Sequence, residues 1–194
     1  MAAATRDRPG MTASATDSTR LGATKPGGET MPALCGDIDM RIGRDGTWFY
    51  HGSPIGRKPL ARLFASVLRR ESDGNYYLVT PVERCLVRVD DAPFVAVEVN
   101  ATDAGPQQEL TFRTNLDDLV SAGPDHPIRV AHNLQTGEPA PYIHVRDRLE
   151  ALIARPVYYE LVDRGVEATV DNKRVFGVWS RGAFFALGPT EERS

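Results

Sequence analysis

A short glycine-rich, basic loop is the first stretch of the sequence whose residue types could do chemistry. Residues 52–58 read GSPIGRK and stand directly before an apolar pattern with helical spacing. Free backbone N–H groups at a helix start, the hydroxyl of Ser53 and the cations Arg57 and Lys58 together suit an anion, above all a phosphate. A plain strand-to-helix connector would also need these glycines, and Pro59 removes one N–H donor from the helix start. The sequence leaves both interpretations open.

Polar and aromatic side chains at the ends of predicted strands form the second group of candidates. Thr80 and Glu83 flank one turn, and Asp91 and Phe94 flank another. Turns at strand ends can line a cleft, where Glu83 or Asp91 would accept hydrogen bonds from a sugar or a base. Pro and Asp are also ordinary turn residues, so turn chemistry alone explains these runs as well.

A third candidate group opens the second half of the chain. Arg113 and Asn115 would face the junction if two halves of the chain pack around the linker between them. Asn115 is equally a candidate N-cap for a short helical turn that ends near Val120. The ligand-binding candidates are therefore Ser53, Arg57, Lys58, Thr80, Glu83, Asp91, Phe94, Arg113 and Asn115.

Four carboxylates, those of Asp37, Asp39, Glu83 and Asp91, are the candidates for acid–base chemistry. Asp37 and Asp39 share one face of a predicted strand, but a solvated face of ion pairs with Arg41 explains that pattern equally well. The four histidines have no metal-ligand spacing, and no serine stands in a nucleophile-elbow context. We therefore expect no catalytic residue, no metal and no cofactor. A hydrolase or transferase that uses these carboxylates is the alternative.

Two cysteines, Cys35 and Cys85, are too few for a disulfide framework and lack the spacing of a zinc site. We expect reduced thiols, although a single bridge between them would also be consistent with the sequence. Cys85 alternates with valines, which predicts a core position. Cys35 stands at the edge of the predicted fold and is a candidate for sensing oxidation.

Composition argues against several classes of protein. The chain has 194 residues and a net charge of −3, so it has no general attraction to nucleic acid or anionic lipid. No run reaches the length of a membrane span, and the first residues lack the continuous apolar block of a secretory signal. We expect a cytoplasmic protein with no nucleic-acid partner, whose oligomeric state the sequence does not define.

Hydrophobic periodicity predicts strands over most of the chain and two short helices. An apolar face at helical spacing predicts a helix over 59–70 in the first half. In the second half we expect a helix over 147–154, ended by Pro156, and then a strand over 157–162. A hairpin turn is predicted around residues 180–182.

Shifts in composition divide the chain into four parts. They are a disordered tail over 1–33, an α+β subdomain over 34–105, a second over 106–188 and a frayed end over 189–194. The order of predicted elements repeats, with residues 40–77 echoing 128–159, although that order is common enough to arise without duplication. The predicted fold class is α+β, with two similar small subdomains that each have a mostly antiparallel sheet and one helix.

The run CGDIDMRIGRDGTWFYHGSPIGRKPLARLF, together with YYLVTPVE and VDDAPFVAVEV, resembles an uncharacterised bacterial family, domain of unknown function 1285. The resemblance covers about residues 35–187, densely in the first half and more loosely in the second. It implies a duplicated two-part α+β fold whose C-terminal part is distantly similar to pleckstrin-homology folds. It also implies a small-molecule site at the seam between the parts and a role in signalling, and no enzyme activity carries over.

The residues and the resemblance together predict a ligand-binding or signalling protein. Its ligand would be a small anion, of which a nucleotide-like molecule is one example, bound at the interface of the two subdomains. A protein-interaction module with a peptide groove in its C-terminal half is the further alternative.

Overall fold

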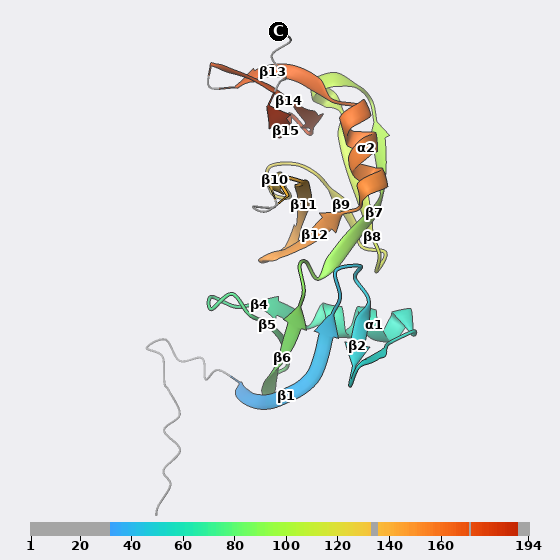
Figure 1. Ribbon diagram of the computed structural model, residues 1–194, viewed down its shortest axis with the longest axis vertical. Coiled ribbons are helices and arrows are strands. Elements are labelled where there is room, and N and C mark those ends of the chain that lie inside the picture. Colours follow the sequence, from blue (N-terminus) through green and yellow to red (C-terminus); the bar gives the residue numbers. More distant parts are fainter. Residues whose placement is uncertain (1–31, 133–135, 171, 190–194) are drawn as a thin grey trace, which may run out of the picture. The chain divides into compact units, whose positions relative to one another are not determined.

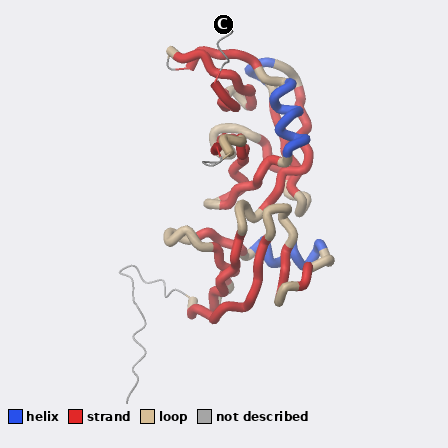
Figure 2. The backbone as a smooth tube through the Cα atoms, in the orientation of Figure 1, coloured by secondary structure: helices blue, strands red, loops and turns tan. Residues whose placement is uncertain are grey.

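The computed structural model describes residues 32–132, 136–170 and 172–189, and strands dominate these segments (Figures 1 and 2). The predicted tail and the predicted frayed end lie almost wholly outside the described residues. The two α-helices of the described segments have nine residues each. Neither of them, nor any other described helix, is long and apolar enough to cross a bilayer.

Six strands of the first half form one sheet in the order β3-β2-β1-β6-β5-β4. Its central pair, β1 and β6, is parallel, and every other neighbouring pair is antiparallel. Helix α1 connects β3 to β4. The bounds are β1 Ala33–Ile42, β2 Trp48–Tyr50, β3 Ser53–Pro54, α1 Lys58–Ser66, β4 Leu68–Arg70, β5 Tyr76–Val79 and β6 Glu83–Val89.

The second half contains a six-stranded sheet, a helix and a smaller sheet. The larger sheet has the order β10-β11-β12-β7-β8-β9, and the smaller has the order β13-β14-β15. The bounds are β7 Phe94–Thr102, the 3-10 helix η1 Gly105–Gln107, β8 Glu109–Thr114, β9 Leu119–Ser121, β10 Ile128–His132, β11 Pro139–Arg146, β12 Leu149–Ile153, α2 Arg155–Asp163, β13 Val166–Val170, β14 Lys173–Ser180 and β15 Ala183–Pro189.

The two six-stranded sheets have the same topology, which confirms the predicted duplication. Read from its other edge, the second sheet runs β9-β8-β7-β12-β11-β10, which is the order of the first with six added to each number. Its one parallel pair again joins the first strand to the last, here β7 and β12. The repeat therefore starts again at β7, not at residue 128 as the sequence suggested.

The division between the sheets falls in the turn at residues 90–93, which connects β6 to β7. Strand β7 pairs with β8 and β12 and so belongs wholly to the second sheet. This change of sheet lies before the loop at residue 105, where we had expected the boundary. Helix α1 follows the third strand of its half, whereas α2 follows the sixth strand of its own.

The predicted first helix is correct at its start and too long at its end. Helix α1 stops at Ser66, and residues 68–70 form β4, whose Leu68 pairs with Leu78 of β5. Pro59 occupies the first turn of α1, where its missing N–H leaves no hydrogen bond unmade.

The predicted helix and the predicted strand of the second half are both wrong: the segment expected to be a helix contains a strand, and the segment expected to be a strand is a helix. Residues 149–153 form β12, in which Leu149, Ala151 and Ile153 are buried in strict alternation. Residues 155–163 form α2, in which the buried side chains of Val157 and Leu161 are four residues apart. The buried positions repeat every two residues in β12, as in a strand, and every four residues in α2, close to the period of a helix. The pattern of burial against the core therefore matches the structure of each segment.

A disulfide joins Cys35 of β1 to Cys85 of β6, so the expected reduced thiols are not what the structure shows. The two residues are direct partners in the parallel pairing, with Cα atoms 5.1 Å apart. That separation suits a disulfide. Fifty residues of sequence separate the cysteines, so only the parallel pairing brings them together.

Candidate functional site

The predicted anion loop lies at the surface, and one of its cations is already paired. Ser53 and Arg57 are exposed, and the ammonium group of Lys58 donates a 2.6 Å hydrogen bond to Asp117 of the second half. This hydrogen bond is the main reason why the pKa of the Asp117 carboxyl lies below its ordinary value. Lys58 therefore acts first as a contact between the two halves.

Asn115 does not cap a helix; its side chain forms hydrogen bonds that connect the two halves. Its side-chain oxygen accepts a 3.0 Å hydrogen bond from the N–H of Val95, and its amide nitrogen donates a 3.1 Å bond to the carbonyl of Gly46. Arg113, two residues earlier, is bound to Glu98 by bonds of 2.8 and 2.5 Å. Both predicted ligand contacts are thus engaged by protein groups.

Asp91 and Phe94 are likewise in contact with other groups of the protein. Asp91 accepts a 2.7 Å hydrogen bond from the Tyr142 hydroxyl and lies 3.2 Å from the guanidinium of Arg44. Burial, followed by the hydrogen bond to Asp91, raises the pKa of Tyr142 to about 12. Phe94 is fully buried beneath the guanidinium of Arg146, 5.0 Å from its ring centre, so it belongs to the core.

Glu83 is the first residue of β6, at the end of the strand away from Asp91, and Thr80 lies three residues before it. The Thr80 hydroxyl accepts a hydrogen bond from the Glu83 N–H and donates one to the Glu83 carbonyl, at 3.1 and 3.0 Å. The structure therefore brings Lys58 and Arg113 together at Asp117, 2.6 and 3.4 Å from its carboxylate, and places Thr80 and Glu83 apart from them. None of the predicted site residues lines any of the three cavities described below.

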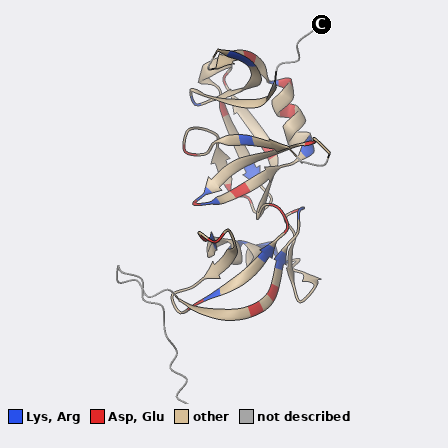
Figure 3. Ribbon diagram, turned by 60° about the vertical axis from the view of Figure 1, so that its left-hand side comes forward, with Lys and Arg blue, Asp and Glu red and all other residues tan. Residues whose placement is uncertain are grey.

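The acidic pair Asp37 and Asp39 forms ion pairs instead of an acid–base site. Both carboxylates pair with Arg88 of β6. The pKa of Asp37 is lowered, first by the N–H of Asp39 and then by Arg88, whereas a general acid needs a raised pKa. Acidic and basic positions are interspersed along the strands in the same way elsewhere (Figure 3).

A cavity of about 490 Å³ lies where the two halves meet, and both halves contribute to its wall. That volume is within the range of small-molecule sites. Its lining residues are Arg70, Glu71, Ser72 and Gly74 from the first half and Arg129, His144, Arg148 and Glu150 from the second. Other cavities of about 430 and 340 Å³ are lined chiefly by residues near α2 and by residues of α1 with Arg146, respectively.

Both glutamates of the 490 Å³ cavity, which we call the junction cavity, already have cationic partners. Glu150 accepts two 2.6 Å hydrogen bonds from Arg129, whose guanidinium also lies over the ring of Tyr142. Glu71 is paired with Arg84. The negative charge of the cavity wall is therefore neutralised within the protein.

Two arginines of the junction cavity, Arg70 and Arg148, have no carboxylate partner among the described residues. Arg70 donates a 3.3 Å hydrogen bond to the carbonyl of Gly74, and its guanidinium lies 5.4 Å from the ring centre of Tyr76. These contacts hold the cation in place without cancelling its charge. Each half thus contributes one guanidinium that has no carboxylate partner within the described part of the chain.

His144 of the second half also lines the junction cavity. Its Nδ1 lies 3.0 Å from the carbonyl of Asp125, and its Nε2 lies 2.7 Å from the carbonyl of Asp147. The backbone at Asp147 positions Arg148, so this contact also orders the turn that carries that arginine.

Sequence reasoning missed Arg70 and Arg148 because it assigned both to helices. In the structure each stands next to a turn, Arg70 at the end of β4 and Arg148 between β11 and β12. Basic residues beside turns are the signal that could have identified them. Their pairing in space depends on how the halves pack, which no local pattern encodes.

Comparisons with known proteins agree with the resemblance found in the sequence. Residues 26–92 match the domain of unknown function DUF1285, N-terminal domain, and residues 93–187 match the DUF1285 C-terminal domain. A search of curated proteins found no match.

Two solved structures are similar to the chain over most of its length. A crystal structure of a DUF1285 family protein from Silicibacter pomeroyi DSS-3 is 54% identical, with a TM-score of 0.76, and the match covers 83% of this chain and 85% of that one. A DUF1285 family protein from Shewanella baltica OS155 is 28% identical, with a TM-score of 0.51, over 66% of this chain and 92% of that one. With both domain models matched in order and 54% identity to a solved relative over 83% of its length, this chain belongs to the DUF1285 family.

Proposed function

We propose that the protein binds a small anionic ligand in the junction cavity and that binding couples its two halves. The observation that carries the proposal is the pair of guanidinium groups, Arg70 and Arg148, that face one cavity from different halves without a described carboxylate partner. Phosphate and carboxylate groups match the planar fork of arginine donors. A phosphorylated small molecule, such as a nucleotide, is therefore the ligand class that the wall suits best.

Each wall residue has a distinct part in this proposal. Arg70 and Arg148 bind the anionic group from opposite sides, and the Ser72 hydroxyl adds one further donor. Gly74 has a φ of +85°, a conformation that keeps the turn tight beneath Arg70. Arg129 stays bound to Glu150 and supports the wall without meeting the ligand's charge.

A ligand held by both halves would stabilise one arrangement of the halves over others. A ligand changes a conformational equilibrium only by as much as its affinity differs between the states. Contacts from both Arg70 and Arg148 exist together only while the halves are docked as described. This dependence is the physical basis for a sensing or signalling role.

The test is calorimetric titration with inorganic phosphate, pyrophosphate and a panel of nucleotides, preceded by a thermal-shift screen of the same compounds. Arg70→Gln and Arg148→Gln should each weaken binding of the best anion by about tenfold or more, since a charged hydrogen bond contributes roughly 1.5–3 kcal/mol. The matched control is Arg57→Gln, which removes an exposed arginine of the predicted loop and should leave the affinity unchanged.

Two results would contradict the proposal. One is the failure of every anion to raise the melting temperature at millimolar concentration. The other is loss of binding in Arg57→Gln with binding retained in Arg70→Gln and Arg148→Gln, which would return the site to the loop before α1.

A further inference from the structure

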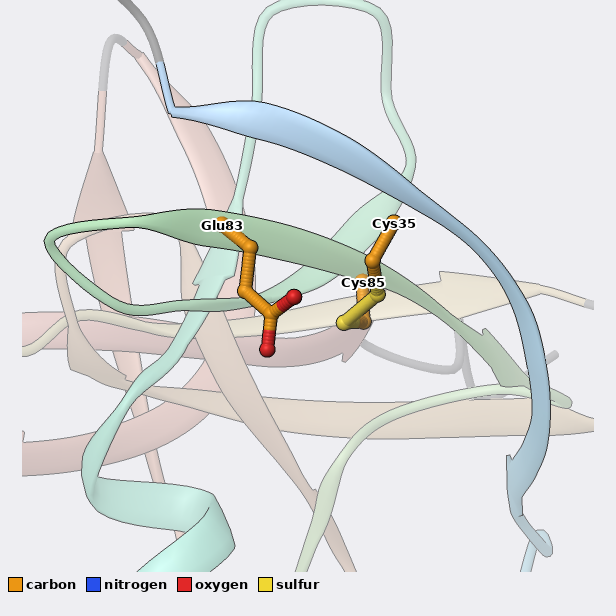
Figure 4. A group of neighbouring side chains, drawn as sticks. All are labelled: Cys35, Glu83 and Cys85. Atoms are coloured by element: carbon orange, nitrogen blue, oxygen red, sulfur yellow. A yellow bond between two sulfur atoms is a disulfide. The ribbon is translucent and has the colours of Figure 1, made fainter.

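Cys35, Cys85 and Glu83 form a cluster of metal-ligating groups in the first sheet (Figure 4). Cys35 and Cys85 are register partners on the parallel strands β1 and β6. Glu83 precedes Cys85 by two residues and so projects from the same face of β6. The two sulfur atoms and a Glu83 carboxylate oxygen all lie within 4.8 Å of one another.

The three groups match the preferences of one metal ion in particular. Zn²⁺ takes thiolate, imidazole and carboxylate ligands in a tetrahedron, and two thiolates bound to it lie about 3.8 Å apart. Once their bond is reduced, two sulfurs on adjacent strands can take up that spacing by side-chain rotation alone. Two thiolates and one carboxylate leave the fourth position to water.

The Glu83 carboxylate is available for such a role. Among the described residues it has no hydrogen bond or ion pair, although the backbone of Glu83 is held by the Thr80 hydroxyl through two hydrogen bonds. Most other acidic groups of the first sheet, such as Asp37 and Asp90, are bound to arginines. Cys35 is partly exposed and Glu83 is exposed, so both reductant and metal can reach the cluster.

We propose that the reduced protein binds one Zn²⁺ through the Cys35 and Cys85 thiolates and the Glu83 carboxylate, and that the oxidised protein does not. In the reducing direction, a dithiol passes two electrons and two protons to the disulfide and becomes a disulfide itself. The two new thiols release their protons as Zn²⁺ binds. In the other direction, a disulfide oxidant accepts two electrons from the two thiolates, the sulfur–sulfur bond re-forms and Zn²⁺ leaves.

This cluster is therefore a site whose occupant depends on redox conditions. The cysteines are bridged under oxidising conditions and hold a metal under reducing conditions, so β1 stays fastened to β6 in both. A chelating pair replaces the covalent bond and preserves the central pairing of the sheet. The proposal is independent of the junction cavity, because none of the three residues lines it.

The experiment compares the full chain in its oxidised and reduced forms. Protein is reduced with a water-soluble phosphine, desalted without oxygen and titrated with ZnCl₂ in competition with a chromogenic chelator. Co²⁺ is then used as a spectroscopic probe, since thiolate ligation produces a charge-transfer absorption that carboxylates alone do not. We expect one Zn²⁺ per reduced chain and binding about a hundredfold weaker or more in the oxidised chain.

Matched variants assign the ligands. Cys35→Ser should abolish the cobalt–thiolate signature of a two-sulfur site, and Glu83→Gln should weaken Zn²⁺ binding by about ten- to a hundredfold. Glu160→Gln, an exposed glutamate of α2, is the control and should change nothing. Circular dichroism checks that Cys35→Ser is folded, while Glu83→Gln keeps the disulfide and so remains testable if Cys35→Ser is not.

Three outcomes would overturn the proposal. They are equal Zn²⁺ affinity in the oxidised and reduced chains, Co²⁺ spectra without thiolate ligation, and unchanged affinity in Glu83→Gln.

Discussion

Tyr142 illustrates how one residue can report on the contact between the two halves. Its hydroxyl donates to Asp91, and burial together with that hydrogen bond raises its pKa to about 12. A tyrosine in the unfolded chain titrates near pH 10. Between about pH 10 and 12 the unfolded chain has therefore lost a proton that the folded protein keeps, so stability falls as the pH rises through that window.

We expect Tyr142→Phe to remove that part of the alkaline loss of stability. The wild type should lose more unfolding free energy between about pH 10 and pH 12 than the variant does, while the stabilisation by Tyr142 is fully present below pH 10. Urea unfolding at both pH values, followed by tryptophan fluorescence, measures the difference. Tyr159→Phe is the control, because Tyr159 is 61% exposed. Parallel pH profiles of wild type and Tyr142→Phe would contradict the assignment.

At the scale of secondary-structure elements, Ser180 connects the two sheets of the second half. It is fully buried at the end of β14, where its hydroxyl donates 2.8 Å to the carbonyl of Ala122 and accepts 2.9 Å from the N–H of Leu110 in β8. A second contact runs from the Gln108 amide to the carbonyl of Trp179, at 2.8 Å. These bonds fasten the three-stranded sheet to the six-stranded sheet of the second half.

Ser180→Ala should lower the unfolding free energy by about 1–3 kcal/mol, because a buried N–H and a buried carbonyl lose their partner. Urea unfolding measures this loss. Ser66→Ala is the matched control: its hydroxyl makes one hydrogen bond at the exposed end of α1, and its loss should cost under about 0.5 kcal/mol. An equal effect of the two substitutions would show that Ser180 does not hold the sheets together.

The elements also show where sequence reasoning succeeds and fails. Strand β8 and the β14–β15 hairpin follow directly from alternation and turn residues. The residues of α2, rich in valine and tyrosine, favour a strand by propensity, yet Pro156 and the spacing of Val157 and Leu161 give a helix. In β12, Leu149, Leu152 and Ile153 imitate a helical seam, but parallel pairing with β7 makes the segment a central strand.

At the scale of the whole molecule, the two halves are joined by side chains that bond across the junction. Asn115 links Val95 of the second half to Gly46 of the first. Arg146 donates 2.8 Å to the carbonyl of Ala65 at the end of α1. Because the partners lie far apart in the chain, no local pattern could have predicted these contacts or the cavity that they frame.

Asn115→Asp should loosen the junction specifically. The substitution keeps an acceptor for the Val95 N–H but removes the donor toward Gly46, so the turn at residues 43–47 should exchange its amide hydrogens faster. The expected loss of stability is about 1–2 kcal/mol, because the carbonyl of Gly46 loses its hydrogen-bond donor. Hydrogen exchange by mass spectrometry measures the turn. Asn100→Asp, at an exposed position of β7, is the control, and unchanged exchange at residues 43–47 would refute the role of Asn115.

The sequence thus predicts the fold class and the duplication. A ligand site at the junction of the halves stays a prediction, and the residues that line the junction cavity are not among those that the sequence proposed. The duplication is recovered in kind because both halves contain runs of alternating strands. The residue at which the repeat begins is not predicted, because β1 and β7 differ in sequence and share only their position in a sheet. Arg70 and Arg148 become candidates only when pairing and packing are known.

The parallel central pairs have a consequence for synthesis on the ribosome. In each half the first strand to be synthesised, β1 or β7, has one edge that pairs only with the last strand of the sheet, β6 or β12. In the first half, the bonded cysteines on these two strands are 50 residues apart. Closing so long a loop delays the contact that completes the sheet, which favours slow folding. We expect each nascent half to expose an unpaired strand edge until its final strand is made, and therefore to depend on chaperones during translation.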